Sequence, residues 1–181
     1  MVVFSKGTGG FLNPEEIVNE FGLKNGMSVA DFGCGHGYFA FPIAKRIQPD
    51  GQVIALDILE SALDSIESRK KLEGLFNIVT KRCDLERGNG SGLKEESQDL
   101  VLVTNLLFQV DNEENIIKEA KRILKPGGTL IIIDWLENSN VGPVGRRVPK
   151  EVAKNLAEKF GFSFEKEIKT GDYHYGLIFK K

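Results

Sequence analysis

Cysteine and histidine are scarce in this sequence, and their scarcity removes whole classes of site. The 181 residues include two cysteines, Cys34 and Cys83, and two histidines, His36 and His174. Two cysteines make neither a disulfide framework nor a metal-ligand cluster, and two histidines so far apart do not indicate a metal site. We therefore expect no bound metal. We also expect Cys34 to be a small buried residue rather than a nucleophile, because nothing beside it in sequence would favour a thiolate.

Long runs of one charge and long apolar runs are also missing. The formal net charge is −2, which gives no electrostatic footprint for nucleic acid or an anionic membrane. No window reaches ~18 uninterrupted apolar residues, and the first residues lack a signal pattern. We expect a cytoplasmic protein with no nucleic-acid partner and no transmembrane segment. The length fits a single domain over residues 1–181.

What the sequence does contain is an alternation of apolar strands and amphipathic helices. The expected strands are residues 27–32, 52–57, 77–84, 99–105, 129–135, 162–170 and 172–181. The expected helices are residues 13–22, residues 38–47, one that includes Leu59 and Ile66, one from Asp111 to the "KPGG" stop at 125–128, and one that begins near Pro149. Asn13 is expected to cap the first helix, and Asp111 with Glu114 to form a capping box.

Such an alternation predicts an α/β fold with a parallel sheet buried on both faces. The last two strands are separated only by a short turn that contains Gly171. A turn that short allows only an antiparallel pair. The sheet is therefore expected to be mostly parallel, with one reversed strand near the end.

The segment "DFGCGHGY", Asp31 to Tyr38, follows the first strand and opens a helix. Each glycine in an ordered element costs about 0.5–1 kcal/mol relative to alanine. Their clustering therefore indicates that a ligand comes close to the backbone, where the helix start offers free N–H groups. The next strand ends at Asp57, where an acid can accept both hydroxyls of a ribose. The pair predicts a nucleoside-containing ligand. The alternatives are that the glycines serve only the turn and that Asp57 only caps the next helix.

The spacing of the glycines distinguishes two such ligands. Dinucleotide-binding loops follow G-x-G-x-x-G, whereas Gly33, Gly35 and Gly37 give G-x-G-x-G. Asp31, two residues before the first glycine, is a poor neighbour for a pyrophosphate and a good one for a cationic amine. The pattern therefore favours a nucleoside linked to an amino acid over a dinucleotide.

With these motifs the sequence resembles the class I S-adenosylmethionine-dependent methyltransferases. The segments "VADFGCGHGY", "VIALD", "CDLE", "DLVLVTNLL" and "LKPGGTLIIID" match that family's motifs in order, and the resemblance covers about residues 13 to 180. Within that family it most resembles the small bacterial and archaeal members related to the quinone-biosynthesis C-methyltransferases. The resemblance implies a Rossmann-like, doubly wound seven-stranded sheet of order 3-2-1-4-5-7-6, with strand 7 antiparallel.

The same resemblance implies roles for individual residues toward S-adenosyl-L-methionine, whose product is S-adenosyl-L-homocysteine. The implied cofactor-binding residues are Asp31 at the amino group, Gly33, Cys34 and Gly35 along the methionine and ribose, Asp57 at the ribose hydroxyls, Ile58 on the adenine, Asp84 and the Leu85 amide at the adenine edge, and Asn105 and Leu106 at the methionine end. Asp84 has the alternative of a turn residue.

The methyl acceptor is the least determined part of this interpretation, and no strong base is evident. Phe108, Trp135 and the aromatic residues of the tail indicate an apolar or aromatic small molecule. Arg146 either receives an acidic substrate or is a surface charge, and His174 either contacts substrate or is an exposed strand position.

The N-terminal segment and helix, residues 1–26, are a candidate lid. We expect residues 4–12 to fold over the pocket with Phe11 near the methionine end; the alternative is a frayed terminus without a role. Two further alternatives remain: the pocket has no cover, or a partner such as a second copy of the chain completes it.

Two other functions remain as alternatives to methyl transfer. One is a non-catalytic S-adenosylmethionine-binding subunit or sensor, which the lack of an evident base keeps open. The other is a nicotinamide-dependent oxidoreductase, which the glycine spacing and the reversed final strand oppose.

Overall fold

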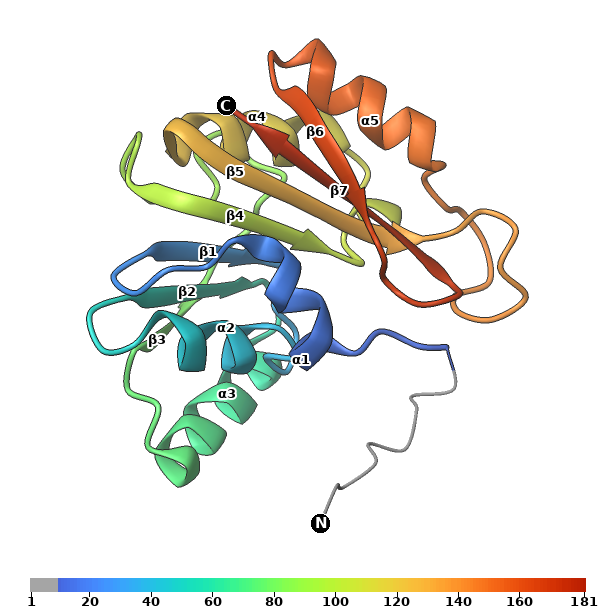
Figure 1. Ribbon diagram of the computed structural model, residues 1–181. Coiled ribbons are helices and arrows are strands. Elements are labelled where there is room, and N and C mark those ends of the chain that lie inside the picture. Colours follow the sequence, from blue (N-terminus) through green and yellow to red (C-terminus); the bar gives the residue numbers. More distant parts are fainter. Residues whose placement is uncertain (1–9) are drawn as a thin grey trace.

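The computed structural model describes residues 10–181, whose seven strands form one sheet (Figure 1). The strands are β1 (Ser28–Phe32), β2 (Gln52–Asp57), β3 (Ile78–Arg82), β4 (Gln98–Thr104), β5 (Leu124–Trp135), β6 (Ser163–Ile168) and β7 (His174–Lys180). Their order is β3-β2-β1-β4-β5-β7-β6. β7 is antiparallel to both of its neighbours, and β1 to β5 pair in parallel. The expected order and the reversed strand are confirmed.

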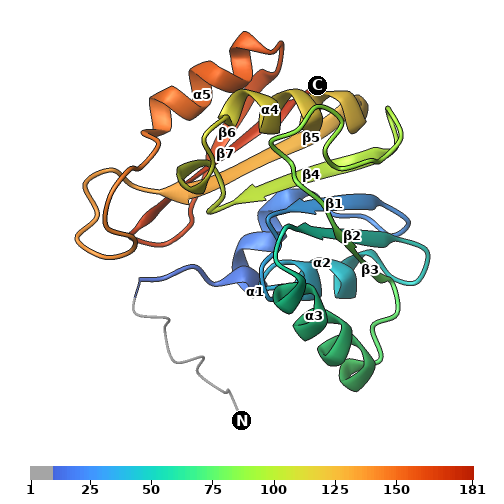
Figure 2. The ribbon, with the colours of Figure 1, turned by 180° about the vertical axis from the view of Figure 1, so that it is seen from behind.

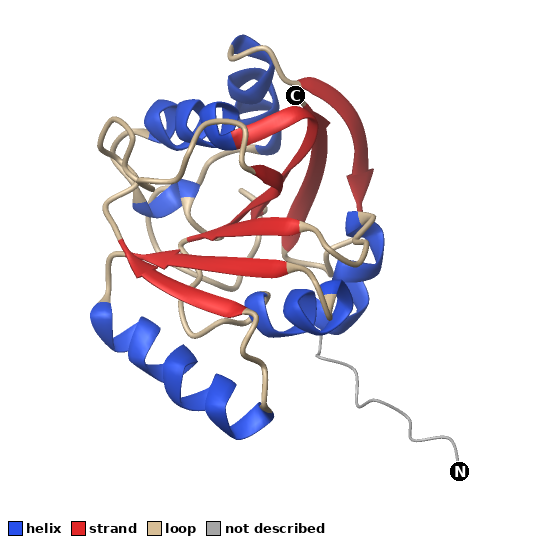
Figure 3. Cartoon of the chain, turned by 90° about the vertical axis from the view of Figure 1, so that its left-hand side faces the viewer, coloured by secondary structure: helices blue, strands red, loops and turns tan. Residues whose placement is uncertain are grey.

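Helices cover both faces of this sheet (Figures 2 and 3). They are α1 (Pro14–Ile17) with the 3-10 turn η1 (Val18–Phe21), α2 (Ala40–Ile47), α3 (Glu60–Glu73), the 3-10 turn η2 (Leu107–Gln109), α4 (Glu113–Ile123) and α5 (Lys150–Lys159). One core cluster joins the sheet to α1, α2 and α3, and the other joins it to α4 and α5. Among residues 10–181, no helix combines the length and apolar character that crossing a membrane requires.

The strand β4 shows why the apolar runs become central strands. Leu100 and Leu102 belong to the core on the α1–α3 face, whereas Val101 and Val103 belong to the core on the α4–α5 face. Successive side chains of a strand point to opposite faces, so a strand covered on both sides must be apolar at every position. The same division holds at β5, where Ile131 and Ile132 belong to different cores.

Two expected helix caps are wrong in detail. Asn13 precedes α1, but its side chain makes no capping hydrogen bond. The cap of α4 is Asn112, whose side chain accepts a hydrogen bond from the Asn115 amide at 3.1 Å. Asp111 cannot form the expected box, because a glutamate elsewhere in the chain, Glu86, accepts the hydrogen bonds of the Asp111 and Asn112 amides.

The centre of the sheet creates a crevice at the carboxyl ends of its strands. β1 lies between β2 and β4. The chain leaves β1 toward α2 on one face, and it leaves β4 toward α4 on the other. Such a reversal of direction is the point at which open α/β sheets bind ligands. The glycine-containing segment after β1 lies there.

Candidate functional site

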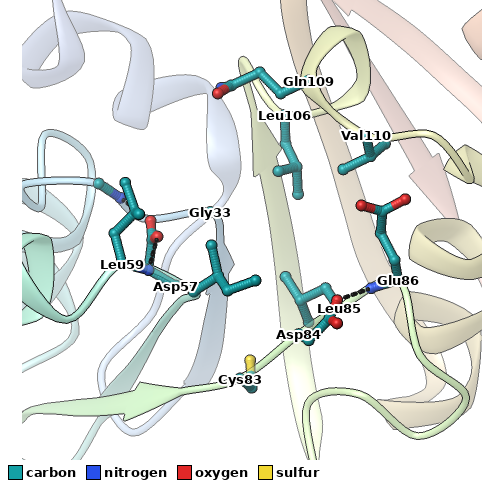
Figure 4. Close-up of a pocket in the computed structure, with 12 residues that line it drawn as sticks. Gly33, Asp57, Leu59, Cys83, Asp84, Leu85, Glu86, Leu106, Gln109 and Val110 are labelled. Carbon is teal, nitrogen blue, oxygen red and sulfur yellow. Dashed lines mark hydrogen bonds between the residues drawn. The ribbon is translucent and has the colours of Figure 1, made fainter.

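A cleft with two connected halves opens at this crevice. The first, which we call the β2–β3 half, has a volume of about 290 Å³ and is lined mainly by residues that follow those strands (Figure 4). The second, the β1–β4 half, is lined by residues that follow β1 and β4, together with Leu12. Gly33, Gly35 and Gln109 line both halves, so the two are continuous.

The glycine loop between β1 and α2 lies where the two halves meet and lines both of them. Gly33 and Gly35 have φ values of +68° and +51°, a conformation that side chains disfavour. A Cβ at Gly33 would lie 3.0 Å from the Leu106 side chain, whereas a Cβ at Gly35 would meet no protein atom within 4 Å. Gly37 has a packing reason instead, because its Cβ would lie 2.7 Å from the Phe41 ring. Gly35 is therefore the position at which the backbone itself borders open cleft.

Asp57, the last residue of β2, holds this loop in place. Its Oδ2 accepts a hydrogen bond from the Gly35 amide at 2.8 Å, and its Oδ1 accepts one from the Leu59 amide at 2.9 Å. A carboxylate has about four acceptor sites, so two remain for a ligand. Beside it, Ile58 and Leu59 are 54% and 61% exposed and line the β2–β3 half. The sequence places Leu59 only in a predicted helix, whereas in the structure it forms an apolar wall of the cleft.

The loop after β3 builds the opposite wall. Asp84 accepts a hydrogen bond from the Glu86 amide at 3.1 Å, and Leu85 lies between these two residues (Figure 4). Asp84 also accepts one from the Arg87 Nε at 2.9 Å, and Leu85 is buried. The Glu86 carboxylate also lines the cleft and ties this loop to the start of α4. Sequence reasoning missed Glu86, because its partners are backbone amides of a distant segment.

The β1–β4 half differs in that its buried polar atoms lack partners. Within the described part of the chain, no hydrogen bond reaches Asp31 Oδ2, Thr104 Oγ1 or Asn105 Oδ1. All three residues line this half. Asp31 is only 2% exposed, and burial, with a smaller contribution from Asp57, raises the pKa of its carboxyl to about 7. Buried polar groups are normally hydrogen-bonded, so this half has the character of a site for a polar ligand.

The turn that follows β4 borders both halves, and hydrogen bonds from within the turn and from the end of β5 hold it in place. Asn105 adopts a φ of +50°, and its carbonyl accepts a hydrogen bond from the Gln109 side chain at 2.6 Å. Asp134, at the end of β5, accepts hydrogen bonds from the Leu107 amide at 3.1 Å and the Trp135 amide at 2.8 Å. Burial raises the pKa of the Asp134 carboxyl to about 6. Neither Gln109 nor Asp134 was predicted to belong to the site: Asp134 ends the motif "LKPGGTLIIID", but the motif does not indicate which backbone amides its carboxylate contacts.

The two remaining reactive residues near the loop have opposite surroundings. Cys34 is buried in the β1–β4 half, and burial raises the pKa of its thiol far above the usual range, as expected for a residue that is not a nucleophile. His36, by contrast, is exposed and lines the same half.

Four of the residues expected at the acceptor do not line either half of the cleft. Phe108, Trp135, Arg146 and His174 are absent from the described lining of both halves. The imidazole of His174 packs against the Trp135 indole with ring centres 4.0 Å apart and ring planes tilted by 39°. His174 is 5% exposed, and burial lowers the pKa of its imidazole to about 4. The expectation of an exposed position at residue 174 is therefore wrong.

Arg146 and its neighbour Arg147 are occupied by protein groups. The Arg146 guanidinium pairs with Glu113 and donates to the Val110 carbonyl. Arg147 donates to the carbonyls of Leu136 and Ser139, among others, and so shapes the loop after β5.

The N-terminal segment reaches the cleft through Leu12. Leu12 lines the β1–β4 half, and its carbonyl accepts a hydrogen bond from the Tyr38 hydroxyl at 2.8 Å. Phe11 turns instead toward the β6–β7 turn, where its ring lies 5.0 Å from that of Tyr173. Gly10 is held at the same turn by the Asp172 amide. The first nine residues of the expected lid lie outside the described residues.

Comparisons with known proteins agree with this architecture. A family model described as "Methyltransferase domain" matches residues 23–175. A demethylmenaquinone methyltransferase of Lactococcus lactis is 29% identical over 154 residues, which are 84% of this chain and 58% of that protein. A ubiquinone/menaquinone biosynthesis C-methyltransferase of Bordetella parapertussis is 31% identical over 166 residues, or 82% of this chain and 62% of that protein. The chain thus spans about three fifths of the length of these two curated relatives.

A solved structure supports the fold over nearly the whole chain. The crystal structure of a SAM dependent methyltransferase from Aquifex aeolicus superimposes with a TM-score of 0.81 at 24% sequence identity. The match covers 97% of this chain and 93% of that one. The two proteins therefore share their overall fold over nearly the whole of both chains.

Proposed function

Because the chain belongs to the methyltransferase domain family, we propose that its cleft binds S-adenosyl-L-methionine and that the protein transfers the methyl group to a small-molecule acceptor. The observation that carries this proposal is the set of unpartnered polar atoms in the β1–β4 half, on Asp31, Thr104 and Asn105. The amino acid end of the ligand offers an ammonium group, which pairs with a carboxylate, and further donors and acceptors for a hydroxyl and an amide.

The β2–β3 half fits the nucleoside end of the same ligand. Asp57 presents its remaining acceptor sites to the ribose hydroxyls, and Ile58 lies where an adenine ring needs an apolar surface. Asp84 and the Leu85 amide border the far end of this half, where they pair with the adenine edge. The open space in front of Gly35 lets the ligand cross between the halves against bare backbone.

The chain's contribution to catalysis is positioning. The bound sulfonium compound supplies a methyl group that is already activated for in-line displacement. Asp31 and Asp57 fix the two ends of the ligand, and the Asn105–Gln109 turn borders the methionine end. Holding two reactants in line and away from water supplies much of the rate enhancement of such reactions.

Calorimetry with S-adenosyl-L-homocysteine, compared with NAD, tests the binding step. We expect binding of the first and none of the second; the reverse would favour the oxidoreductase alternative. A methyl-transfer assay over a panel of small molecules then tests catalysis. Tight binding with no turnover of any acceptor would favour a non-catalytic binding subunit.

A further inference from the structure

The walls around the expected methyl position are almost free of charge. Apart from Asp31, no acidic side chain and no lysine or arginine is among the described residues that line the β1–β4 half. Arg146, the cation once expected to receive an acidic substrate, is paired with Glu113. An acceptor with a carboxylate or phosphate beside its reacting atom would therefore lose its hydration without a compensating cation. The geometry favours an uncharged acceptor.

One face of this half also offers an exposed aromatic surface. The ring of Tyr38 is 55% exposed at the cleft, beside His36 on the same loop. A planar ring gains hydrophobic contact and favourable aromatic geometry on such a surface. Gln109 also lines this half, and its side-chain amide adds a polar group to the lining.

An uncharged hydroxyl acceptor needs a base to take its proton. Four residues with titratable side chains line this half. They are Asp31, Cys34, His36 and Tyr38. The Tyr38 hydroxyl donates a hydrogen bond to the Leu12 carbonyl, and the buried Cys34 holds its proton because its pKa is raised. Asp31 is closed from solvent and, under the proposed function, pairs with the ligand's ammonium group. The remaining residue is His36, which is exposed to solvent rather than buried.

We propose that His36 is the general base for methyl transfer to a neutral ring hydroxyl, such as a phenol, that lies between Tyr38 and Gln109. This inference rests on the proposed function and adds to it a catalytic residue and a substrate class. A ring nitrogen of His36 takes the hydroxyl proton while the oxygen attacks the methyl carbon. The carbon–sulfur bond breaks, its electron pair stays on sulfur to give the neutral thioether, and the imidazolium releases its proton to water. Imidazole is suited to this task near neutral pH.

Acceptors of different acidity test the base directly. At about pH 8 we would compare 1-naphthol, which is still mostly protonated, with 4-nitrophenol, which is largely ionised, by following S-adenosyl-L-homocysteine formation in the full chain. H36Q should lower kcat/KM for 1-naphthol by about 100-fold, within the usual range for loss of a general base. It should leave 4-nitrophenol almost unaffected. With S-adenosyl-L-methionine saturating at every pH, log(kcat/KM) for 1-naphthol in the parent protein should fall with unit slope toward acid pH, and H36Q should lose that limb.

A second variant separates a chemical role from a structural one. Added imidazole should restore activity to H36A with 1-naphthol, since the small base can enter the vacated space. Affinity for S-adenosyl-L-homocysteine, measured by calorimetry, should be the same in the parent, H36Q and H36A. If that ligand binds but no phenol or naphthol is methylated, the inference is wrong while the binding part of the proposed function stands. Equal losses for both acceptors, or an acid limb that persists in H36Q, would assign the base to another group such as Asp31.

Discussion

The two halves of the cleft use the same kinds of side chain in opposite ways. In the β2–β3 half, Asp57 and Asp84 are each tied by hydrogen bonds to protein groups before any ligand arrives. In the β1–β4 half, the buried oxygens of Asp31 and Asn105 have no such bond within the described residues. One half is organised by its own backbone, and the other keeps polar groups whose partners must come from a ligand.

This difference has an energetic consequence. A buried polar atom without a partner destabilises the protein by about 1–3 kcal/mol, and burial of Asp31 shows its effect in the raised pKa of that carboxyl. A ligand that forms hydrogen bonds to these atoms in the β1–β4 half removes this destabilisation, and the free energy recovered adds to its affinity. The β2–β3 half contributes shape and geometry instead, because its loop is fixed in advance.

The sharpest way to break the continuity of the two halves is to fill the space in front of Gly35. Gly35→Val should abolish binding of S-adenosyl-L-homocysteine, because its branched side chain would enter open cleft, where the protein has no atom within 4 Å. The measurement is calorimetry, with circular dichroism to confirm folding. Gly74→Val is the matched control, since Gly74 ends α3 with a φ of +67° and likewise has no neighbour within 4 Å. Both variants carry the same backbone strain. Normal binding by a folded G35V protein would reduce the glycines to turn residues.

Removing the organised carboxylate should have the next largest effect. Asp57→Ala should weaken S-adenosyl-L-homocysteine binding by about 1–3 kcal/mol, since ligand hydroxyls lose a charged acceptor. It should also lower the melting temperature slightly, because the Gly35 and Leu59 amides lose their partner. Asp64→Ala, at an exposed position of α3, should change neither quantity. Unchanged affinity in D57A would remove this carboxylate from the ligand site.

Asp31→Asn tests the unorganised half and should cost about tenfold in affinity near pH 8, the loss of one charge-assisted bond. The pKa of the Asp31 carboxyl is 3.8 in the unfolded chain and about 7 in the folded protein. Between those values the folded protein keeps a proton that the unfolded chain has lost, so its stability without ligand falls as pH rises. D31N should lack this fall, and its ligand affinity should no longer increase from pH 5 to pH 8. Melting curves and calorimetry over that range check both; parallel pH profiles in parent and variant would contradict the assignment.

The contrast between the halves also explains what the sequence predicts and what it does not. The strands were predictable because each buried strand is a short apolar run, and the end of β2 at Asp57 matches the expectation. The helix caps were not, because Asn112 and Asp111 are equally good capping residues by type. The choice between them depends on Glu86, which reaches the two amides from the loop after β3.

Tertiary contacts likewise decide the parts of the site that sequence reasoning missed. Asp134 belongs to an apolar strand in the sequence, and only the fold brings its carboxylate to the turn after β4. His174 lies between two tyrosines in sequence, which indicated an exposed position. Its pairing with Trp135 across β5 and β7 buries it. Such residues act through partners distant in sequence, and no local pattern identifies those partners.

The smallest predicted effect concerns the contact that links the N-terminal segment to the open half. Tyr38→Phe removes the hydroxyl that donates to the Leu12 carbonyl, a bond worth about 0.5–1.5 kcal/mol. If residues 10–12 help to close the β1–β4 half, Y38F should reduce the rise in melting temperature that S-adenosyl-L-homocysteine produces, because a looser cover lowers affinity. Tyr175→Phe is the matched control: its hydroxyl also donates to a backbone carbonyl, that of Val148, at 3.0 Å, but outside the cleft. Y175F should lower the melting temperature with and without ligand by the same amount. Equal ligand-induced shifts in parent, Y38F and Y175F would show that this segment packs against the cleft without closing it.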